Sequence, residues 1–232
     1  MKMQEFKKGI RDGIPICLGY ISVSMAFGLT AVKMGIPIGV TVLISLTNLT
    51  SAGQFAGTTL LAAHGTYLEL AITTLIINIR YFLMSLSVSQ KVDKDFKTGQ
   101  RFIASFGITD EVFAVSMQQR NDLSFLYMAG LILTPVLGWT GGTLIGAAAT
   151  SLLPQVLTDA MGIALYGMFI AIIVPPAREQ KSVLFAVVLT ILASYAFTYL
   201  PVFNHISGGW SVIIITIVVS AIAACLFPVK EE

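Results

Sequence analysis

Residues 69–91 read Glu69-LAITTLIINI-Arg80-YFLMSLSVSQ-Lys91, a long apolar run with one charge at its centre. Ten uncharged residues lie on each side of Arg80. A membrane-spanning helix needs about 20 mostly apolar residues, so this run is long enough to cross a bilayer. At 1.5 Å per residue, Arg80 lies roughly 16 Å along a helix from Lys91, too deep to reach the membrane surface easily. A charge at that depth is costly and is by default a candidate functional residue.

The whole chain has the composition of a membrane protein. Of its 232 residues, 56% are hydrophobic and 11% are charged, and the mean hydropathy is +0.85. A soluble domain carries about 25% charged residues, so the composition excludes a soluble globular enzyme and a disordered protein. The net charge of +2 gives no electrostatic footprint for nucleic acid. Cys17 and Cys225 lie in apolar runs, with neither metal-ligand spacing nor a disulfide framework.

Uncharged stretches elsewhere locate the other spans. They are residues 13–32, 34–68, 123–158, 160–177 and 182–229, and the last is long enough for two spans around a turn at Pro201–Trp210. The alternating ten-residue segments of a β-barrel do not occur in the sequence. We therefore expect an all-α fold: a polytopic integral-membrane helical bundle of six to eight transmembrane segments, with broken or re-entrant helices.

The basic residues predict the orientation in the membrane. Residues 1–12 form a cationic cytoplasmic lead-in without a signal-peptide cleavage site, and we treat 1–232 as one transmembrane transporter domain with both termini cytoplasmic. If every apolar segment crosses, there are eight spans and the basic loop 90–100 lies outside, against the positive-inside rule. If 38–63 and 102–119 instead re-enter, six segments cross and nearly all basic residues are cytoplasmic. The second arrangement fits the charges better, but both stay open.

Two segments contain polar stretches that predict helix breaks. Thr47–Gln54 (TNLTSAGQ) divides the segment 38–63, and residues 105–109 (SFGIT) precede the acidic pair Asp110-Glu111 in the segment 102–119. Non-helical backbone at membrane depth is tolerated only where it lines a cavity or is buried in protein. Many transporters build their substrate sites from broken helices that meet near the bilayer midplane.

The charges at membrane depth each allow two interpretations. Arg80 can anchor a substrate carboxylate, because a guanidinium binds a carboxylate through two hydrogen bonds, or it can pair with Asp110 or Glu111 and fix the bundle. The two acids can bind an ammonium group or carry protons, since burial raises the pKa of a carboxyl group, or they can be solvated on an interfacial helix. Asn48 and Gln54 can line a polar cavity or make interhelical hydrogen bonds.

Small residues recur every four positions in the segment after Asp122. They are Gly130, Thr134, Gly138, Gly142 and Gly146, a stripe that lets another helix approach closely. The stripe is either ordinary packing within the bundle or an interface with a partner subunit. His64 and His205 are expected at the membrane interface. No metal-binding, nucleotide-binding or hydrolase motif occurs in the sequence, so we expect no catalytic residue, metal or cofactor.

Three motifs give a resemblance to a known family. They are Ser51-Ala-Gly-Gln-Phe-Ala-Gly57, Ile77-Asn-Ile-Arg-Tyr-Phe-Leu-Met-Ser85 and Thr109-Asp-Glu-Val-Phe-Ala114. In this order they resemble the AzlC family, also called the LIV-E or YgaZ type, over most of the chain. The resemblance implies an exporter of branched-chain amino acids (leucine, isoleucine, valine and also methionine) in the bacterial cytoplasmic membrane. It also implies a small AzlD-type membrane subunit as a partner, supplied as a separate chain.

Together these observations predict a secondary transporter, not an enzyme, driven by the proton gradient and embedded in the lipid bilayer, with no nucleic-acid partner. Asp110 and Glu111 are the candidates for proton coupling or ammonium binding, and Phe55, Phe82 and Phe113 for selecting an aliphatic substrate. The candidate substrate-binding residues are Arg80, Asn78, Tyr81, Asn48, Ser51, Gln54 and Phe55, and the candidate helix-packing residues are Gly138, Gly142 and Gly146. The alternatives are a channel-like pore for a small polar solute and a non-transporting membrane assembly subunit.

Overall fold

The structure is a computed structural model that describes residues 2–150, 170, 173–203 and 205–228. Within these ranges the regular elements are helices and there are no strands; one isolated bridge joins Val92 to Leu123. The expected all-α class is confirmed.

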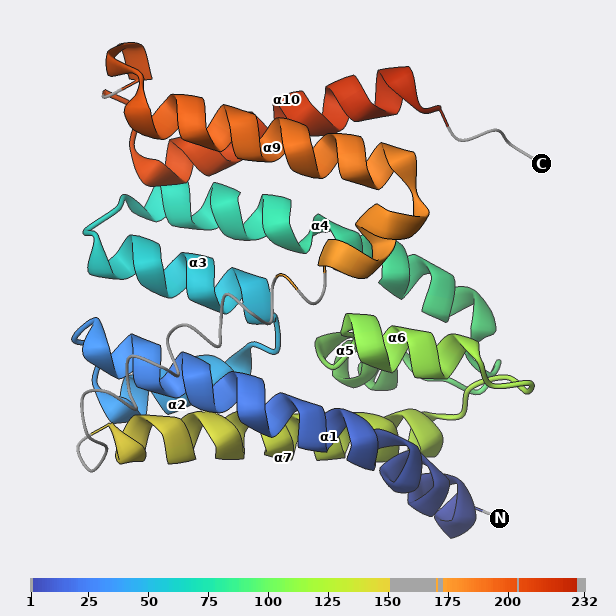
Figure 1. Ribbon diagram of the computed structural model, residues 1–232. Coiled ribbons are helices and arrows are strands. Elements are labelled where there is room, and N and C mark those ends of the chain that lie inside the picture. The colour runs from blue at the N-terminus through green and yellow to red at the C-terminus, as the bar shows by residue number, and fades with distance from the viewer. Residues whose placement is uncertain (1, 151–169, 171–172, 204, 229–232) are drawn as a thin grey trace. The chain divides into compact units, whose positions relative to one another are not determined.

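The helices up to residue 149 follow one another along the chain with short connections. The described helices are α1 (Lys2–Lys33), α2 (Ile38–Thr47), α3 (Ser51–Ala62), α4 (Tyr67–Lys91), α5 (Thr98–Phe106), α6 (Asp110–Met117), α7 (Phe125–Ala149), α9 (Lys181–Tyr199) and α10 (Gly208–Leu226), with a 3-10 turn η1 (Pro201–Phe203) before α10 (Figure 1). Among the described residues, α1, α4, α7, α9 and α10 are long and apolar enough to cross a membrane. The span expected at 160–177 lies mostly outside the described residues.

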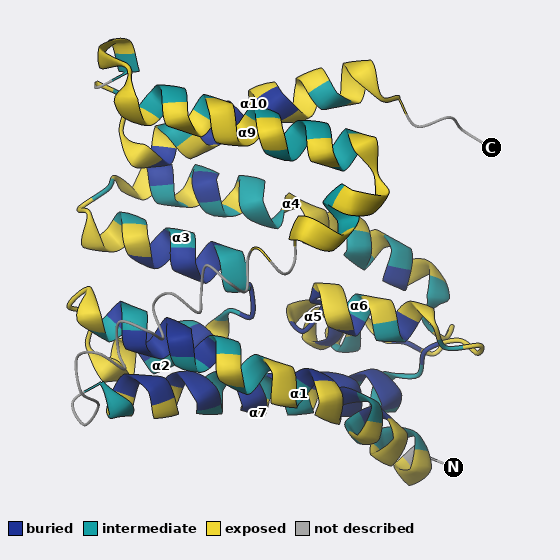
Figure 2. Ribbon diagram, viewed as in Figure 1, coloured by how far each residue is buried: buried dark blue, intermediate teal, exposed yellow. Residues whose placement is uncertain are grey.

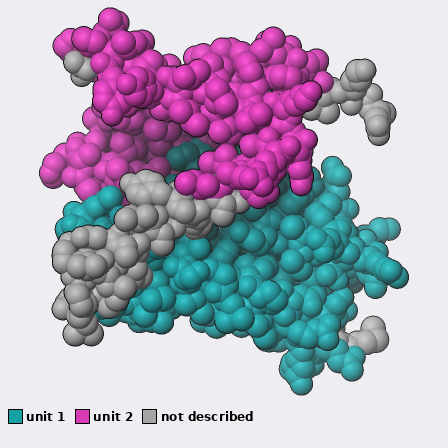
Figure 3. All heavy atoms as spheres, in the orientation of Figure 1, with its two compact units in different colours: residues 1–55, 77–162 teal, residues 56–76, 163–232 magenta. Residues whose placement is uncertain are grey.

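The chain divides into two compact units, coloured separately in Figure 3. Unit 1 comprises Met1–Phe55 and Ile77–Gly162, and unit 2 comprises Ala56–Ile76 and Ile163–Glu232. Helices α1, α2, α5, α6 and α7 belong to unit 1, and α9 and α10 belong to unit 2. Helices α3 and α4 contribute residues to both units. The single transporter domain over residues 1–232 stays a prediction.

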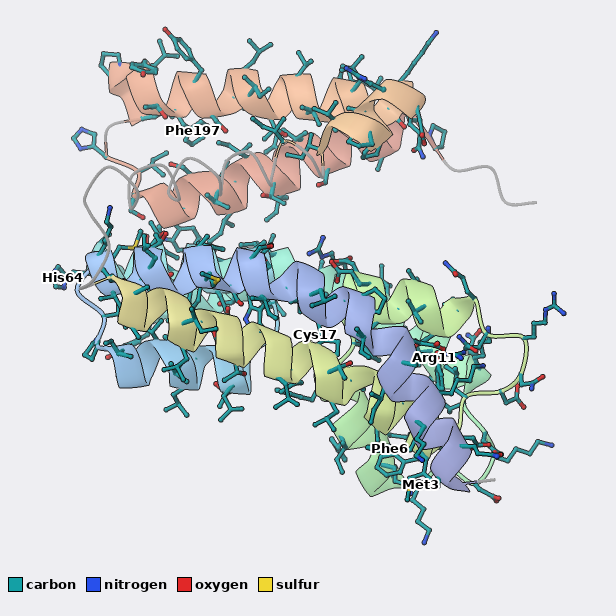
Figure 4. The ribbon with its side chains drawn as sticks, turned by 60° about the horizontal axis from the view of Figure 1, so that its bottom comes forward. Met3, Phe6, Arg11, Cys17, His64 and Phe197 are labelled. Atoms are coloured by element: carbon teal, nitrogen blue, oxygen red, sulfur yellow. The ribbon has the colours of Figure 1, made fainter. Side chains whose placement is uncertain are left out.

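Unit 1 is built on a close contact between α1 and α7, which run side by side (Figure 1). A methyl group at Gly138 would lie 2.6 Å from the Cys17 carbonyl oxygen, and one at Gly142 would lie 2.6 Å from the Ile21 carbonyl oxygen. Cys17, labelled in Figure 4, marks this contact on α1. Gly146 likewise meets the backbone of Met25. The three candidate packing glycines therefore face α1 of the same chain.

The segments 38–63 and 102–119 each consist of two short helices. Helices α2 and α3 have 10 and 12 residues, and α5 and α6 have 9 and 8. The longest of these is about 18 Å, well short of the roughly 30 Å hydrocarbon core of a bilayer. Three non-helical residues separate the members of each pair, at 48–50 and at 107–109.

The pair α5 and α6 begins and ends at the same end of unit 1. The Leu123 amide, after α6, donates to the Lys91 carbonyl, before α5, at 2.8 Å. The start of α1 lies at this end too, because Lys8 Nζ donates to Gln119 Oε1 at 2.6 Å. A segment with both ends at one place is what the six-crossing arrangement requires of residues 102–119. The same contacts place the basic residues 1–12 and the basic loop after α4 at one end of unit 1.

Gln54 holds the first helix break together. Its side chain is buried, with 2% of its surface exposed, and Nε2 donates to the carbonyls of Ile44 at 3.1 Å and Asn48 at 2.6 Å. The last carbonyls of a helix lack intrahelical partners, so the Gln54 amide satisfies groups freed where α2 ends. Its Oε1 accepts a hydrogen bond from Trp139 Nε1 of α7 at 2.9 Å. The break is therefore tied to the α1–α7 pair.

In unit 2, α9 and α10 pack against each other. No residue of α9 is buried, and its exposed apolar side chains are typical of a lipid-facing helix (Figure 2). Glu69 at the start of α4 is 4% exposed and accepts hydrogen bonds from the Thr66 amide at 2.9 Å and from Ser207. These contacts give its buried carboxylate a structural role as a helix cap.

The α1–α7 contact predicts opposite effects at two neighbouring glycines. Gly142→Ala places a methyl group against the backbone of Ile21, and we expect a loss of about 1–3 kcal/mol in stability, as for other overpacked sites. Gly141 is the control on the same helix, because a methyl group added there would have nothing within 4 Å. Gly141→Ala should be neutral or stabilising, since alanine favours helix by about 1 kcal/mol over glycine. Thermal melts of detergent-solubilised protein, read by size-exclusion chromatography, test this; equal melting temperatures would contradict the assignment.

The contacts of Gln54 predict that Gln54→Leu loosens the first break. The change leaves two carbonyls and the Trp139 indole N–H without this partner, at about 1–3 kcal/mol for each buried unsatisfied group. The chain has two tryptophans, so a Trp210→Phe background reports Trp139 fluorescence alone. We expect a lower melting temperature and a changed Trp139 emission, whereas Gln118→Leu, at an exposed glutamine, should change neither. An unchanged spectrum in the Gln54 variant would show that the hydrogen bond does not hold the break.

Candidate functional site

The two helix breaks line one cavity within unit 1. Its volume is about 150 Å³, and its lining comes from the first break, α4 and the second break: Thr47, Asn48, Leu49, Thr50, Asn78, Tyr81, Ser105, Phe106, Ile108 and Thr109. An engineered cavity of roughly 150 Å³ holds one benzene molecule, so this space suits a group of comparable size. We call it the central cavity.

Helix α4 presents Asn78 and Tyr81 to the central cavity from one of its faces. Thr50 Oγ1 donates to Asn78 Oδ1 at 2.6 Å, which joins the first break to α4. Helix α4 is continuous from Tyr67 to Lys91, so Asn78 and Arg80 lie on different faces of a regular helix. The helix is therefore polar on both sides at this depth.

Arg80 forms an ion pair with Asp110 at the start of α6. The distance from Nη2 to Oδ2 is 3.0 Å, and both side chains are 49% exposed. The same guanidinium lies 5.1 Å from the ring centroid of Tyr81 and donates to its hydroxyl at 3.4 Å. Arg80 thus reaches the central cavity through Tyr81 and does not line it. Protein covers only about half of each side chain, so a ligand can approach both partners.

Glu111 is held by a residue of α1. The Tyr20 hydroxyl donates to the Glu111 carboxylate and lies 2.7 Å from Thr109 Oγ1. Thr109 is the N-cap of α6, and its hydroxyl accepts from the Val112 amide at 3.3 Å. Asp110 and Glu111 lie in the first turn of α6. The helix dipole favours carboxylates at this position.

Arg80, Asp110 and Glu111 form a charged cluster beside the central cavity. The cluster contains two carboxylates and one guanidinium, so it has a surplus negative charge when both acids are ionised. An imbalance of this kind favours one added cation, either a proton or an ammonium group. The cluster can therefore offer a guanidinium to an anionic group and a carboxylate to a cationic one.

The structure separates the sequence-predicted residues into those at the cavity and those beside it. Asn48, Asn78 and Tyr81 line the central cavity, but Gln54, Ser51 and Phe55 do not. Phe55 packs edge-on against Phe27 with ring centroids 5.2 Å apart. Phe82 and Phe113 also lie outside the lining, whose apolar members are Leu49, Phe106 and Ile108. Among the described residues no group of histidine, cysteine and acidic side chains is placed to hold a metal ion.

Sequence reasoning missed Tyr20 and the role of Trp139. Their rings meet edge to face, with centroids 5.2 Å apart, across the α1–α7 contact. Tyr20 binds Glu111 at the second break, and Trp139 binds Gln54 at the first. A tyrosine near the middle of an otherwise apolar span was the available signal for Tyr20, since a buried hydroxyl needs a partner.

Comparison with known proteins gives consistent matches. A family model described as AzlC protein matches residues 15–153, which include the lining of the central cavity and the charged cluster. The inner membrane protein YgaZ of Escherichia coli (strain K12) is 29% identical over 184 residues, covering 76% of this chain and 75% of that protein. An uncharacterized membrane protein of Archaeoglobus fulgidus is 32% identical over 181 residues, covering 77% and 79%.

A further relative matches a smaller share of this chain. An uncharacterized membrane protein of Helicobacter pylori (strain ATCC 700392 / 26695) is 29% identical over 158 residues, covering 64% of this chain and 68% of that protein. No solved structure matches the chain. The family match spans more than half of the chain and contains the three motifs that the sequence singled out, at residues 51–57, 77–85 and 109–114. The protein therefore belongs to the AzlC family of membrane proteins.

Proposed function

We propose that this protein is a secondary transporter that exports branched-chain amino acids across the bacterial cytoplasmic membrane, with both termini in the cytoplasm. The observation that carries the proposal is the Arg80–Asp110 ion pair beside a small cavity lined by two helix breaks. Broken helices at membrane depth are a recurrent way to build a transporter site.

An amino acid has charges that match those of the cluster. Its carboxylate can replace Asp110 at the Arg80 guanidinium, and its ammonium group can replace Arg80 at Asp110. Neither protein charge is left without a partner, and the existing pair is half-exposed and therefore open to the ligand. Substrate binding therefore removes one internal ion pair and forms two with the zwitterion.

The apolar part of the substrate would lie in the central cavity. Leu49, Phe106 and Ile108 give it apolar walls, and its volume of about 150 Å³ suits a branched aliphatic side chain. Tyr81 lines this cavity and contacts Arg80. The apolar part of one small molecule can therefore lie in the cavity while its charged groups bind at the charged cluster. These walls take the role that the sequence predicted for Phe55, Phe82 and Phe113.

Proton coupling is assigned to Glu111. Its carboxylate supplies the surplus negative charge of the cluster, and the Tyr20 hydroxyl gives it a hydrogen-bond partner in the ionised form. Protonation of Glu111 would neutralise the surplus and weaken that bond, because a protonated carboxyl group is a poorer acceptor. Because Tyr20 belongs to α1, the proton then changes how α1 holds α6.

We further propose that the chain works with a small AzlD-type membrane subunit. Membership of the AzlC family supports this proposal. Reconstitution with and without such a subunit would show whether transport needs it. The same vesicles distinguish a channel, whose flux does not saturate, and an assembly subunit, which gives no flux in either case.

The first prediction from this site compares the two members of the ion pair. In vesicles loaded with labelled leucine, Arg80→Ala should abolish efflux and weaken leucine binding roughly 10- to 100-fold, the effect of losing a charged hydrogen bond. Asp110→Asn breaks the same pair and removes the ammonium contact, so it too should weaken leucine binding, but binding of isocaproate, which has the carboxylate and no ammonium group, should persist in this variant and not in Arg80→Ala. If the pair is only structural, both variants lose stability and binding to the same extent. Wild-type efflux from the Arg80→Ala protein would rule out the anchor.

The second prediction isolates the proton. Glu111→Gln should keep leucine exchange between the two sides of the vesicle but lose the acceleration of net efflux by a pH gradient. The control is Asp12→Asn, because Asp12 also accepts a hydrogen bond from a tyrosine, Tyr127, at 3.1 Å, and it lies away from the cluster. Gradient-driven efflux that is intact in the Glu111 variant and absent in the Asp12 variant would reverse the assignment.

A further inference from the structure

A second hollow, open at the protein surface, lies beside the central cavity within unit 1; the Phe82 and Phe102 side chains in its walls are 64% and 74% exposed. Its volume is about 350 Å³, within the range of sites for small ligands. The second half of α4, the loop after it and α5 form its walls, which are mainly apolar and include Phe82, Leu86, Phe96 and Phe102. We call this space the vestibule. None of the roles assigned above uses it.

The vestibule and the central cavity share two lining residues, Ser105 and Ile108. Ile108 is 6% exposed and lies within the second helix break. The adjacent Gly107 is pressed against α7, because a methyl group there would lie 2.6 Å from Cγ1 of Ile132. Ser105 is small, and its hydroxyl donates to the Phe102 carbonyl at 2.9 Å. The two spaces therefore adjoin at Ser105 and Ile108, which we call the partition.

Arg101 gives the vestibule a positive charge. It is the one charged side chain among the described lining residues, and it has no ion pair within the described part of the chain. Its guanidinium lies 5.9 Å from the ring centroid of Phe96, at the edge of the apolar walls. A free guanidinium next to an apolar space matches a molecule that has a carboxylate and a short aliphatic chain.

The vestibule also lies at the end of unit 1 where the basic segments gather. Val92 and Phe96 of its lining follow α4 directly, in the same loop that bonds to Leu123. The positive-inside rule assigns this end to the cytoplasm. An exporter loads its substrate from that side, so the vestibule has the position of a loading site.

We propose that the vestibule is a second substrate site, in which Arg101 holds the carboxylate of an aliphatic amino acid before it passes Ser105 and Ile108 into the central cavity. The inference rests on the proposed function. Its occupant is the free amino acid and not a membrane lipid, because the partition residues connect this space with the site that binds the zwitterion.

Cysteine protection tests the proposal. Cys17 and Cys225 are the two cysteines of the chain, so Cys17→Ala with Cys225→Ser removes reactive thiols, and Ser85→Cys then places one in the vestibule lining. In inside-out vesicles with the full chain, leucine should protect this cysteine from a hydrophilic maleimide. Arg101→Gln should raise the leucine concentration for half-protection roughly 10- to 100-fold. Arg120→Gln, at an exposed basic residue of the same end that does not line the vestibule, should leave it unchanged.

A second variant separates loading from passage. Ser105→Trp fills the partition, and it should stop leucine efflux while leucine still protects Ser85→Cys. Efflux by the Ser85→Cys parent without leucine protection would overturn the vestibule and leave the proposed function standing. Protection that follows the phosphatidylglycerol content of the vesicle and not leucine would assign the space to lipid and overturn the proposal. A parent that exports no leucine with its partner subunit present would overturn the proposed function and the vestibule together.

Discussion

The close contact between α1 and α7 is the constraint on which the rest of unit 1 depends. Glycines let the two backbones approach until a single methyl group would collide with a carbonyl oxygen, as at Gly138 and Gly142. This approach brings Tyr20 and Trp139 edge to face. From that pair, Trp139 reaches Gln54 at the first break and Tyr20 reaches Glu111 at the second. One interface therefore positions both interruptions of the helical backbone.

Each helix break leaves backbone carbonyl and amide groups without helical partners, and this explains the hydrogen bonds around the breaks. Backbone groups at membrane depth have no water to bind, so each freed carbonyl needs a protein partner. Gln54 supplies that partner at the end of α2, and Thr109 caps the start of α6. Because these side chains already satisfy the backbone, the Arg80–Asp110 pair is not needed to close either break. That the pair has no role in closing the breaks is consistent with the proposed exchange of its partners with a ligand.

The fold class and the charged residues of the candidate site could be picked out from the sequence, because both follow from where charge is scarce. Arg80, Asp110 and Glu111 stood out as charges inside apolar runs, and the polar stretch Thr47–Gln54 marked a break. The direction of individual side chains could not be predicted. Gln54 and Phe55 belong to the family motif at the first break, yet both point into packing and not into the central cavity. Helical periodicity does not fix which face is inward when the neighbouring helices are unknown.

The partner of Tyr20 lies 91 positions away in sequence, so no local pattern could reveal that contact. Its consequence concerns how the two halves of the site can move. Asp110 and Glu111 are adjacent on α6, but Asp110 is bound to α4 and Glu111 is bound to α1. In the proposed transporter, a ligand that replaces Arg80 at Asp110 would release α6 from α4, and a proton on Glu111 would release α6 from α1. Each event would favour a different set of partners for α6. Helix α6 has 8 residues and follows a non-helical stretch, so it can shift position in either case. In the proposed mechanism, the adjacency of the two acids would therefore couple the substrate to the proton.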